Sequence, residues 1–176
     1  MALLEARKAV LDRKTRWVGN LSMVVLGALI SRVLLPATLV GVSVWAQQED
    51  FRLFNVMLGY AQSGSSLTGI SDAVESSGVV FAVIVTLSVI LLDMIIYWQH
   101  RLFHTVPLLW RFHKMHHADS HVDTTTGLRF HPVEIAISLG VKAAAVALLG
   151  IPAVAIVIFE VALNGFALFN HANIRL

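Results

Sequence analysis

The run GVVFAVIVTLSVILLDMIIYW, from Gly78 to Trp98, constrains the fold more than any other part of the chain, because Asp93 is its only charged residue. As a helix rising about 1.5 Å per residue it would reach about 30 Å, the thickness of the hydrocarbon core of a bilayer. Charged residues make up only 14% of the chain, whereas soluble domains average about 25%. We therefore predict an integral membrane protein.

Two other apolar segments accompany this span. Trp17–Ala46 is interrupted by Arg32 and Pro36, which predicts either one tilted, kinked helix or a helix followed by an interfacial piece. No convincing small-residue cleavage site follows this apolar stretch, so we expect a retained membrane anchor and not a signal peptide. Residues 47–77 are rich in Gly and Ser, which indicates a loop with a short helix at residues 51–61.

The last apolar segment, Ile135–Phe169, is too long for a single span. Gly150-Ile151-Pro152 in its middle predicts a break and therefore a tight helical hairpin. The expected fold is an all-α, polytopic membrane helix bundle with about three or four membrane helices and short histidine-bearing helices. We expect one membrane domain, residues 1–176.

Basic residues are distributed unevenly along the chain. They cluster in residues 1–16 and 101–133, whereas the loop 47–77 contains only Arg52. The positive-inside rule then predicts that the N-terminus, the histidines and the C-terminus are cytoplasmic. No aromatic-basic pattern indicates nucleic-acid binding.

Five of the eight histidines lie in QHRLFHTVPLLWRFHKMHH, directly after the span. They form two groups: His100 and His104, then His113, His116 and His117. Spacings of three and four residues would place each group on one helix face. Thr105 is a candidate N-cap of the second helix, and Pro107 is tolerated in its first turn.

Imidazoles without thiolates suit iron, zinc, copper or nickel. The chain has no cysteine, which excludes zinc–thiolate sites and cysteine-ligated iron–sulfur clusters. So many histidines exceed one tetrahedral site and indicate two metals. The zinc-protease motif H-E-x-x-H is absent, since Arg101 follows His100. Haem ligation is an alternative that leaves most of these histidines unexplained, and His121 alone indicates only a polar interfacial residue.

Several further residues could support the ligands through hydrogen bonds: Asp93, His131, Glu134, Glu160 and Asn164. An aspartate inside an apolar span needs a partner, and Asp93 lies two helical turns before His100. His131 suits capping of the hairpin as well as ligation. Glu160 and Asn164 share a helical face with His171, and helix–helix hydrogen bonding is their alternative role. No catalytic residue beyond the metal ligands is expected.

From Gly78 onward the sequence resembles the fatty acid hydroxylase/sterol desaturase superfamily of membrane di-iron enzymes. The resemblance rests on DMIIYWQHRLFH, RFHKMHH, TTTGLRFHPVE and NHANIRL. It implies a cytoplasmic di-iron centre that uses O2 and electrons from an external donor. The implied reaction is hydroxylation, or desaturation, of a lipid such as a fatty-acyl chain or a sterol-like substrate. The implied metal ligands are His100, His104, His113, His116, His117 and His171.

The superfamily has another H-x-x-H-H box after the position of His171, and none follows in this chain. We therefore expect residues 78–176 to be a C-terminally incomplete hydroxylase-like region. The alternative function is a non-catalytic membrane metal-binding protein, or an inactive fragment of such an enzyme. The expected partners are the membrane, a lipid substrate and an unidentified electron donor.

Overall fold

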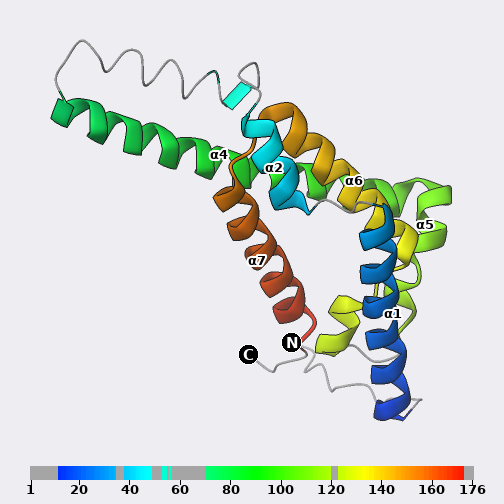
Figure 1. The fold of residues 1–176 in the computed structure, drawn as a ribbon. Helices are drawn as coiled ribbons and strands as arrows, with labels where there is room; N and C mark the ends of the chain where they lie inside the picture. The colour runs from blue at the N-terminus through cyan, green and yellow to red at the C-terminus, as the bar shows by residue number, and fades with distance from the viewer. Residues whose placement is uncertain are drawn as a thin grey trace. The chain divides into compact units, whose positions relative to one another are not determined.

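The computed structural model describes residues 12–34, 38–48, 53, 54, 56, 70–119 and 123–172, and every regular element among them is helical. The elements are α1 (Arg13–Leu34), α2 (Leu39–Gln47), α4 (Ile70–Thr105), α5 (Pro107–His113), η2 (His116–Ala118), η3 (Thr124–Leu128), α6 (Pro132–Leu149) and α7 (Ala153–Asn170) (Figure 1). The predicted all-α fold is confirmed.

Three helices are long and apolar enough to cross a membrane: Gly78–Thr105 within α4, and the whole of α6 and α7. Their exposed side chains are largely aliphatic and aromatic, as expected of surfaces that face lipid. The chain is therefore an integral membrane protein.

The segment Trp17–Ala46 forms two helices. α1 ends at Leu34 and α2 begins at Leu39, where the Thr38 hydroxyl accepts a hydrogen bond from the Gly41 N–H at 3.1 Å. This outcome selects a helix followed by a separate piece over one continuous helix. Neither α1 nor α2 is among the candidate spans found in the described residues.

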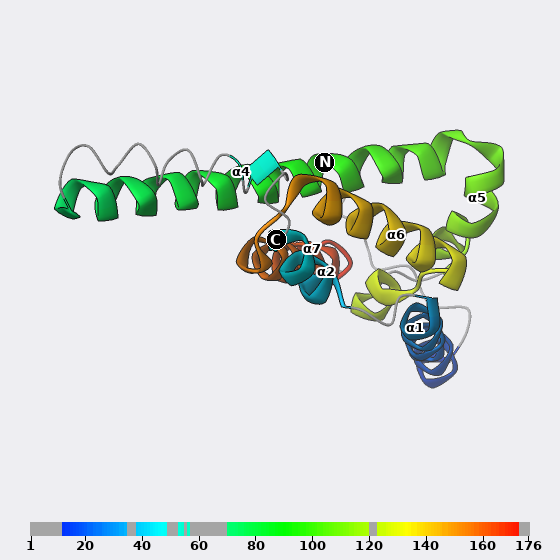
Figure 2. The ribbon, with the colours of Figure 1, turned by 45° about the horizontal axis from the view of Figure 1, so that its top comes forward.

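The helix α4 begins earlier than the sequence indicates. Residues 70–77 were predicted as loop, yet they are helical and continue without interruption into the span (Figure 2). The Gly and Ser content of residues 47–77 suggested a loop. From Ile70 to Ser77, however, the chain contains no Gly or Pro that would break a helix.

By its internal contacts the chain divides into two compact units. The histidine unit comprises residues 1–36, 98–139 and 162–176, and the hairpin unit comprises residues 37–97 and 140–161. The helices α4, α6 and α7 each contribute residues to both units. The expectation of a single membrane domain stays a prediction.

The hairpin unit contains the predicted break between α6 and α7. Gly150 adopts φ 70°, a left-handed conformation that favours glycine, and its N–H donates to the Val146 carbonyl at 3.0 Å. Lys142 on α6 forms an ion pair with Glu160 on α7. The predicted helical hairpin is confirmed.

Candidate metal centre

The histidine unit brings together side chains from four elements. The end of α4 carries His100 and His104, α5 carries His113, η2 carries His116 and His117, and His171 directly follows α7. Buried groups beside them are largely polar, since His113, His116, Thr126 and Glu134 are all buried. Such a polar interior indicates a functional site more than a packing core.

The predicted helix from Val106 to Ala118 is interrupted. α5 ends at His113, a turn follows, and η2 begins at His116. Thr105 is not the N-cap: it is the last residue of α4, and its hydroxyl donates to the Arg101 carbonyl at 3.1 Å. Val106 occupies the N-cap position, and Pro107 takes the first position of α5. Thr105 is not the N-cap of α5, because α4 continues as far as this residue.

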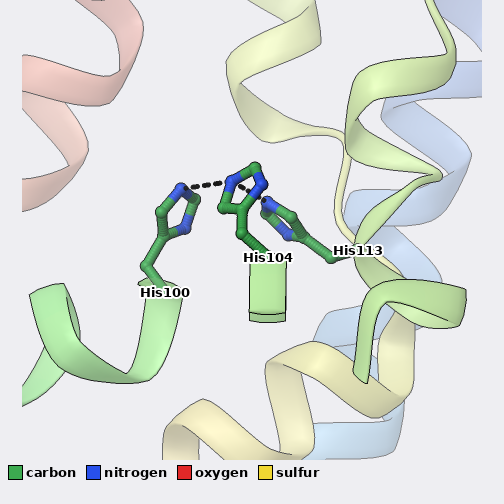
Figure 3. A group of neighbouring side chains, drawn as sticks. All are labelled: His100, His104 and His113. Carbon is green, nitrogen blue, oxygen red and sulfur yellow. Dashed lines mark hydrogen bonds between the residues drawn. The ribbon is translucent and has the colours of Figure 1, made fainter. Parts of the chain in front are cut away.

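Three imidazoles turn toward one another at the end of α4 (Figure 3). His104 Nε2 lies 3.2 Å from both His100 Nε2 and His113 Nε2. The ligand atoms of these three residues all lie within 4.8 Å of one another. His117 Nε2 lies 3.2 Å from His113 Nε2, next to this group of three. We call these four residues the Nε2 cluster.

Neighbouring nitrogens in the Nε2 cluster have a spacing that suits a shared metal ion, while the ligand atoms of His100, His104 and His113 together extend over 4.8 Å. Two nitrogens bound to one ion at about 2.1 Å would lie roughly 3.0 to 3.4 Å apart, for octahedral or tetrahedral angles. The observed separation of 3.2 Å falls inside that interval. A neutral imidazole has one N–H and one nitrogen lone pair. Where Nε2 lone pairs of several rings meet, they repel one another, and a shared cation would remove that repulsion.

Oxygen acceptors fix the tautomer of three rings. His113 Nδ1 lies 2.7 Å from Glu134 Oε1, His116 Nδ1 lies 3.2 Å from the Arg129 carbonyl, and His171 Nδ1 lies 2.7 Å from the Ala167 carbonyl. Backbone carbonyl oxygens can only accept, and an ionised Glu134 does the same, so in these hydrogen bonds each Nδ1 carries the proton. Each Nε2 then carries the lone pair, as metal-ligating histidines require.

Glu134 shows a second feature that fits a cation. It is 5% exposed, and in the described part of the chain its Oε2 has no hydrogen-bond partner. A buried carboxylate beside a neutral imidazole is costly. A metal ion on His113 Nε2 would supply the missing positive charge through the ring.

Desolvation lowers the pKa values of the histidines of α5 and η2 and so favours their neutral form. Desolvation, followed by the charges of neighbouring histidines, lowers the pKa of His113 to about 3. Desolvation is also the main cause that lowers the pKa of His116 to about 4, against a raising contribution from its hydrogen bond to the Arg129 carbonyl. The pKa of His117 is lowered by burial and then by His104. Neutral imidazole is the form that binds metals.

His116 and His171 form a second pair. Their ring centroids lie 5.1 Å apart, and His116 stacks on Phe130 at 4.6 Å with an interplanar angle of 4°. A Cβ added to Gly127 would lie 3.2 Å from His171 Nδ1 and 3.0 Å from the Ala167 carbonyl. Glycine therefore permits the close approach of η3 to the end of α7.

The remaining residues that were predicted to support the metal ligands differ in their contacts. His131 Nδ1 accepts the Val133 N–H at 3.1 Å, so this nitrogen caps α6. Glu160 pairs with Lys142, which is the helix–helix role. Asp93 on α4 and Asn164 on α7 are exposed, and their support of the ligands stays a prediction. His121 lies outside the described residues.

Sequence reasoning missed a polar network that joins α1 to the loop beyond η2. Arg16 donates to Asp119 and Asp123, and Asn20 Nδ2 donates to Asp119 Oδ2 at 3.2 Å and to Thr125 Oγ1 at 2.9 Å. Asp123 was readable from the sequence as a helix N-cap, whereas its capping box with Thr126 was not, because the usual motif has Glu or Gln at that position. The contact with α1 had no sequence signal, because the partners are about a hundred residues apart.

Comparison with known families places these motifs in context. Residues 85–176, just over half of the chain, match the family model described as fatty acid hydroxylase. No curated protein and no solved structure matched the chain. The matched range contains all six converging or paired histidines and their partner Glu134. The chain belongs to the fatty acid hydroxylase family.

Proposed function

We propose that this chain forms the metal-binding part of a membrane oxidoreductase that uses O2 to hydroxylate, or desaturate, a C–H bond of a lipid. The observation that carries the proposal is the Nε2 cluster, in which imidazole nitrogens meet at 3.2 Å. Family membership supports the reaction class. The substrate class we infer is a fatty-acyl chain or a sterol-like lipid, since the spans would admit an apolar substrate from the bilayer.

The proposed metal is di-iron. An all-imidazole donor set is compatible with iron, and the Nε2 cluster would hold one ion, with His116 and His171 contributing to the other. When bound, iron supplies the redox chemistry that protein side chains lack. The electrons would come from an external donor, and the charge distribution supports a cytoplasmic site.

The protein's own contribution is to keep the ligating histidines in the tautomer that binds a metal through Nε2. Glu134 accepts the Nδ1 proton of His113 and so keeps the lone pair on Nε2. The Arg129 and Ala167 carbonyls do the same for His116 and His171. The ligands sit at the ends of α4 and α7, so a lipid chain in the bilayer would present its C–H bonds close to the membrane surface.

A non-catalytic metal-binding protein is the second candidate. The observation that favours it is exposure: His100, His104 and His117 are exposed in the described part of the chain. Oxidation of an unactivated C–H bond works best where water is excluded. A metal-storage role would tolerate this exposure.

The first experiment measures metal binding. The full chain is purified in lipid nanodiscs, loaded anaerobically with Fe²⁺ and desalted, and its iron content is determined by mass spectrometry. We expect His113→Ala to lose most of the iron, because His113 lies at the centre of the Nε2 cluster. His131→Ala is the matched control and should retain it, because His131 Nδ1 caps α6. Equal iron in both variants would contradict the metal site.

The second experiment separates enzyme from binding protein. The iron-loaded chain is incubated with O2, a chemical reductant and nanodisc lipids, and the lipids are analysed by mass spectrometry. A hydroxylated or desaturated product that is absent from His113→Ala supports the oxidoreductase. Iron binding without any such product would favour the non-catalytic candidate.

A further inference from the structure

A buried cation on α1 lies outside the residues that match the family. The side chain of Arg16 is 4% exposed and that of Asp119 is 3% exposed. Arg16 Nε donates to Asp119 Oδ1 at 2.9 Å, and Nη2 donates to Asp119 Oδ2 at 3.1 Å. Nη2 also donates to Asp123 Oδ2 at 3.0 Å. A bidentate arginine–carboxylate pair of this kind fixes the relative orientation of the two side chains in addition to neutralising the charge.

The two carboxylates occupy the ends of the short helices. Asp119 is the C-cap of η2, and Asp123 is the N-cap of η3. Asp123 also accepts the Thr125 N–H at 2.9 Å within its capping box. Arg16 therefore fixes the end of η2 relative to the start of η3.

Both short helices position the second histidine pair. η2 carries His116, and the residue that caps the end of η3, Arg129, supplies the carbonyl that accepts the His116 Nδ1 proton at 3.2 Å. Gly127 within η3 lies against His171. The contacts of Arg16 with Asp119 and Asp123 therefore fix two features: the Arg129 carbonyl that accepts from His116, and the position of Gly127 against His171.

His113 provides an internal comparison. His113 Nδ1–H donates to Glu134 Oε1 on α6, with 2.7 Å between the nitrogen and the oxygen. This hydrogen bond involves no residue of α1, η2 or η3. A local change at Arg16 should therefore affect His116 and spare His113. General unfolding would affect both.

We propose that Arg16 is a positioning residue for the His116–His171 pair, so that α1 is part of the metal centre. Without the guanidinium, the carboxylates of Asp119 and Asp123 would lose the cation that both now contact through Nη2 and would keep only neutral hydrogen-bond donors such as Asn20. The repulsion between the two carboxylates would move η3 and withdraw the Arg129 carbonyl from His116. The importance of this pair for oxidation rests on the proposed function, whereas its placement does not.

The test reads the tautomer of each ring directly. The full metal-free chain, with ¹⁵N-labelled histidine, is studied by NMR in nanodiscs at neutral pH, and signals are assigned with His113→Ala and His116→Ala. The variants are Arg16→Gln and, as the matched control on the same helix, Arg32→Gln, which removes an exposed cation. Helix content and a monodisperse elution profile verify the fold.

We expect the Nδ1–H form of His116 to change from major to minor in Arg16→Gln, while His113 keeps it and Arg32→Gln changes neither. An unchanged His116 in folded Arg16→Gln would overturn the proposal, as would an equal change at both rings. If Arg16→Gln does not fold, Arg16→Lys serves instead. Lysine keeps the charge but loses the bidentate pairing, so a smaller change confined to His116 supports the proposal and no change overturns it.

Discussion

At the scale of single residues, the site depends on which nitrogen of each ring holds the proton. Three histidines donate a hydrogen bond from Nδ1–H to an oxygen, and for His113 that oxygen belongs to the buried carboxylate of Glu134. The sequence HPVE suggested a supporting role for Glu134. Only the tertiary structure pairs it with His113, because the two residues come from different helices.

Glu134→Ala should weaken Co²⁺ binding by about 10- to 100-fold, the usual effect of losing a group that supports a metal ligand. The Nδ1 proton of His113 would be left buried without an acceptor, and the ring would be free to reorient. Glu134→Gln should weaken binding less, since the amide oxygen can still accept. Optical titration of the purified chain with Co²⁺ measures both. Equal affinities for Glu134→Ala and the unmodified chain would contradict this role.

At the scale of elements, turns and caps decide where each histidine faces. α4 continues for about two turns beyond Trp98, to Thr105, so His100 and His104 lie on the same continuous helix as the span. α5 then stops at His113, so His116 and His117 leave from a separate 3-10 turn. Spacing alone places all three residues on one face. The break follows from contacts that η2 makes outside its own segment.

The hairpin turn offers a test at this scale. Gly150→Ala should destabilise the protein by about 1 kcal/mol, because a Cβ disfavours the left-handed conformation at φ 70°. Gly140→Ala is the matched control: an added Cβ meets nothing within 4 Å there, and alanine favours a helix interior. Denaturant titration in detergent should therefore give opposite signs for the two variants. A stabilising Gly150→Ala would disprove the conformational argument.

At the scale of the whole molecule, the histidine unit contains an unusual density of polar groups for a membrane protein. Its buried residues include Arg16, Asn20, His113, His116 and Glu134. Burial of neutral imidazoles links the stability of the metal-free protein to pH.

The metal-free protein should lose stability as the pH falls below about 6.5. The folded-state pKa of His113 is about 3 and that of His116 about 4, both below the ordinary value of 6.5. Between these values the unfolded chain binds protons that the folded chain does not, at about 1.4 kcal/mol per pH unit for each group. Thermal unfolding between pH 6.5 and pH 4 measures the effect, because this interval lies within the window of both shifts. In His113→Ala/His116→Ala the slope should be shallower, and an unchanged slope would refute the assignment.

The membrane character of the chain, the hairpin break at Gly150-Ile151-Pro152 and the two histidine groups all follow from the amino-acid sequence. Each of these depends on local properties: hydrophobic length, backbone conformation and helical spacing. The tertiary structure decided which rings share a point, which acceptor fixes each tautomer, and that Arg16 on α1 contacts Asp119 and Asp123. Those contacts join residues far apart in the chain, and no local preference encodes them, because they exist only after helices from different segments have packed together.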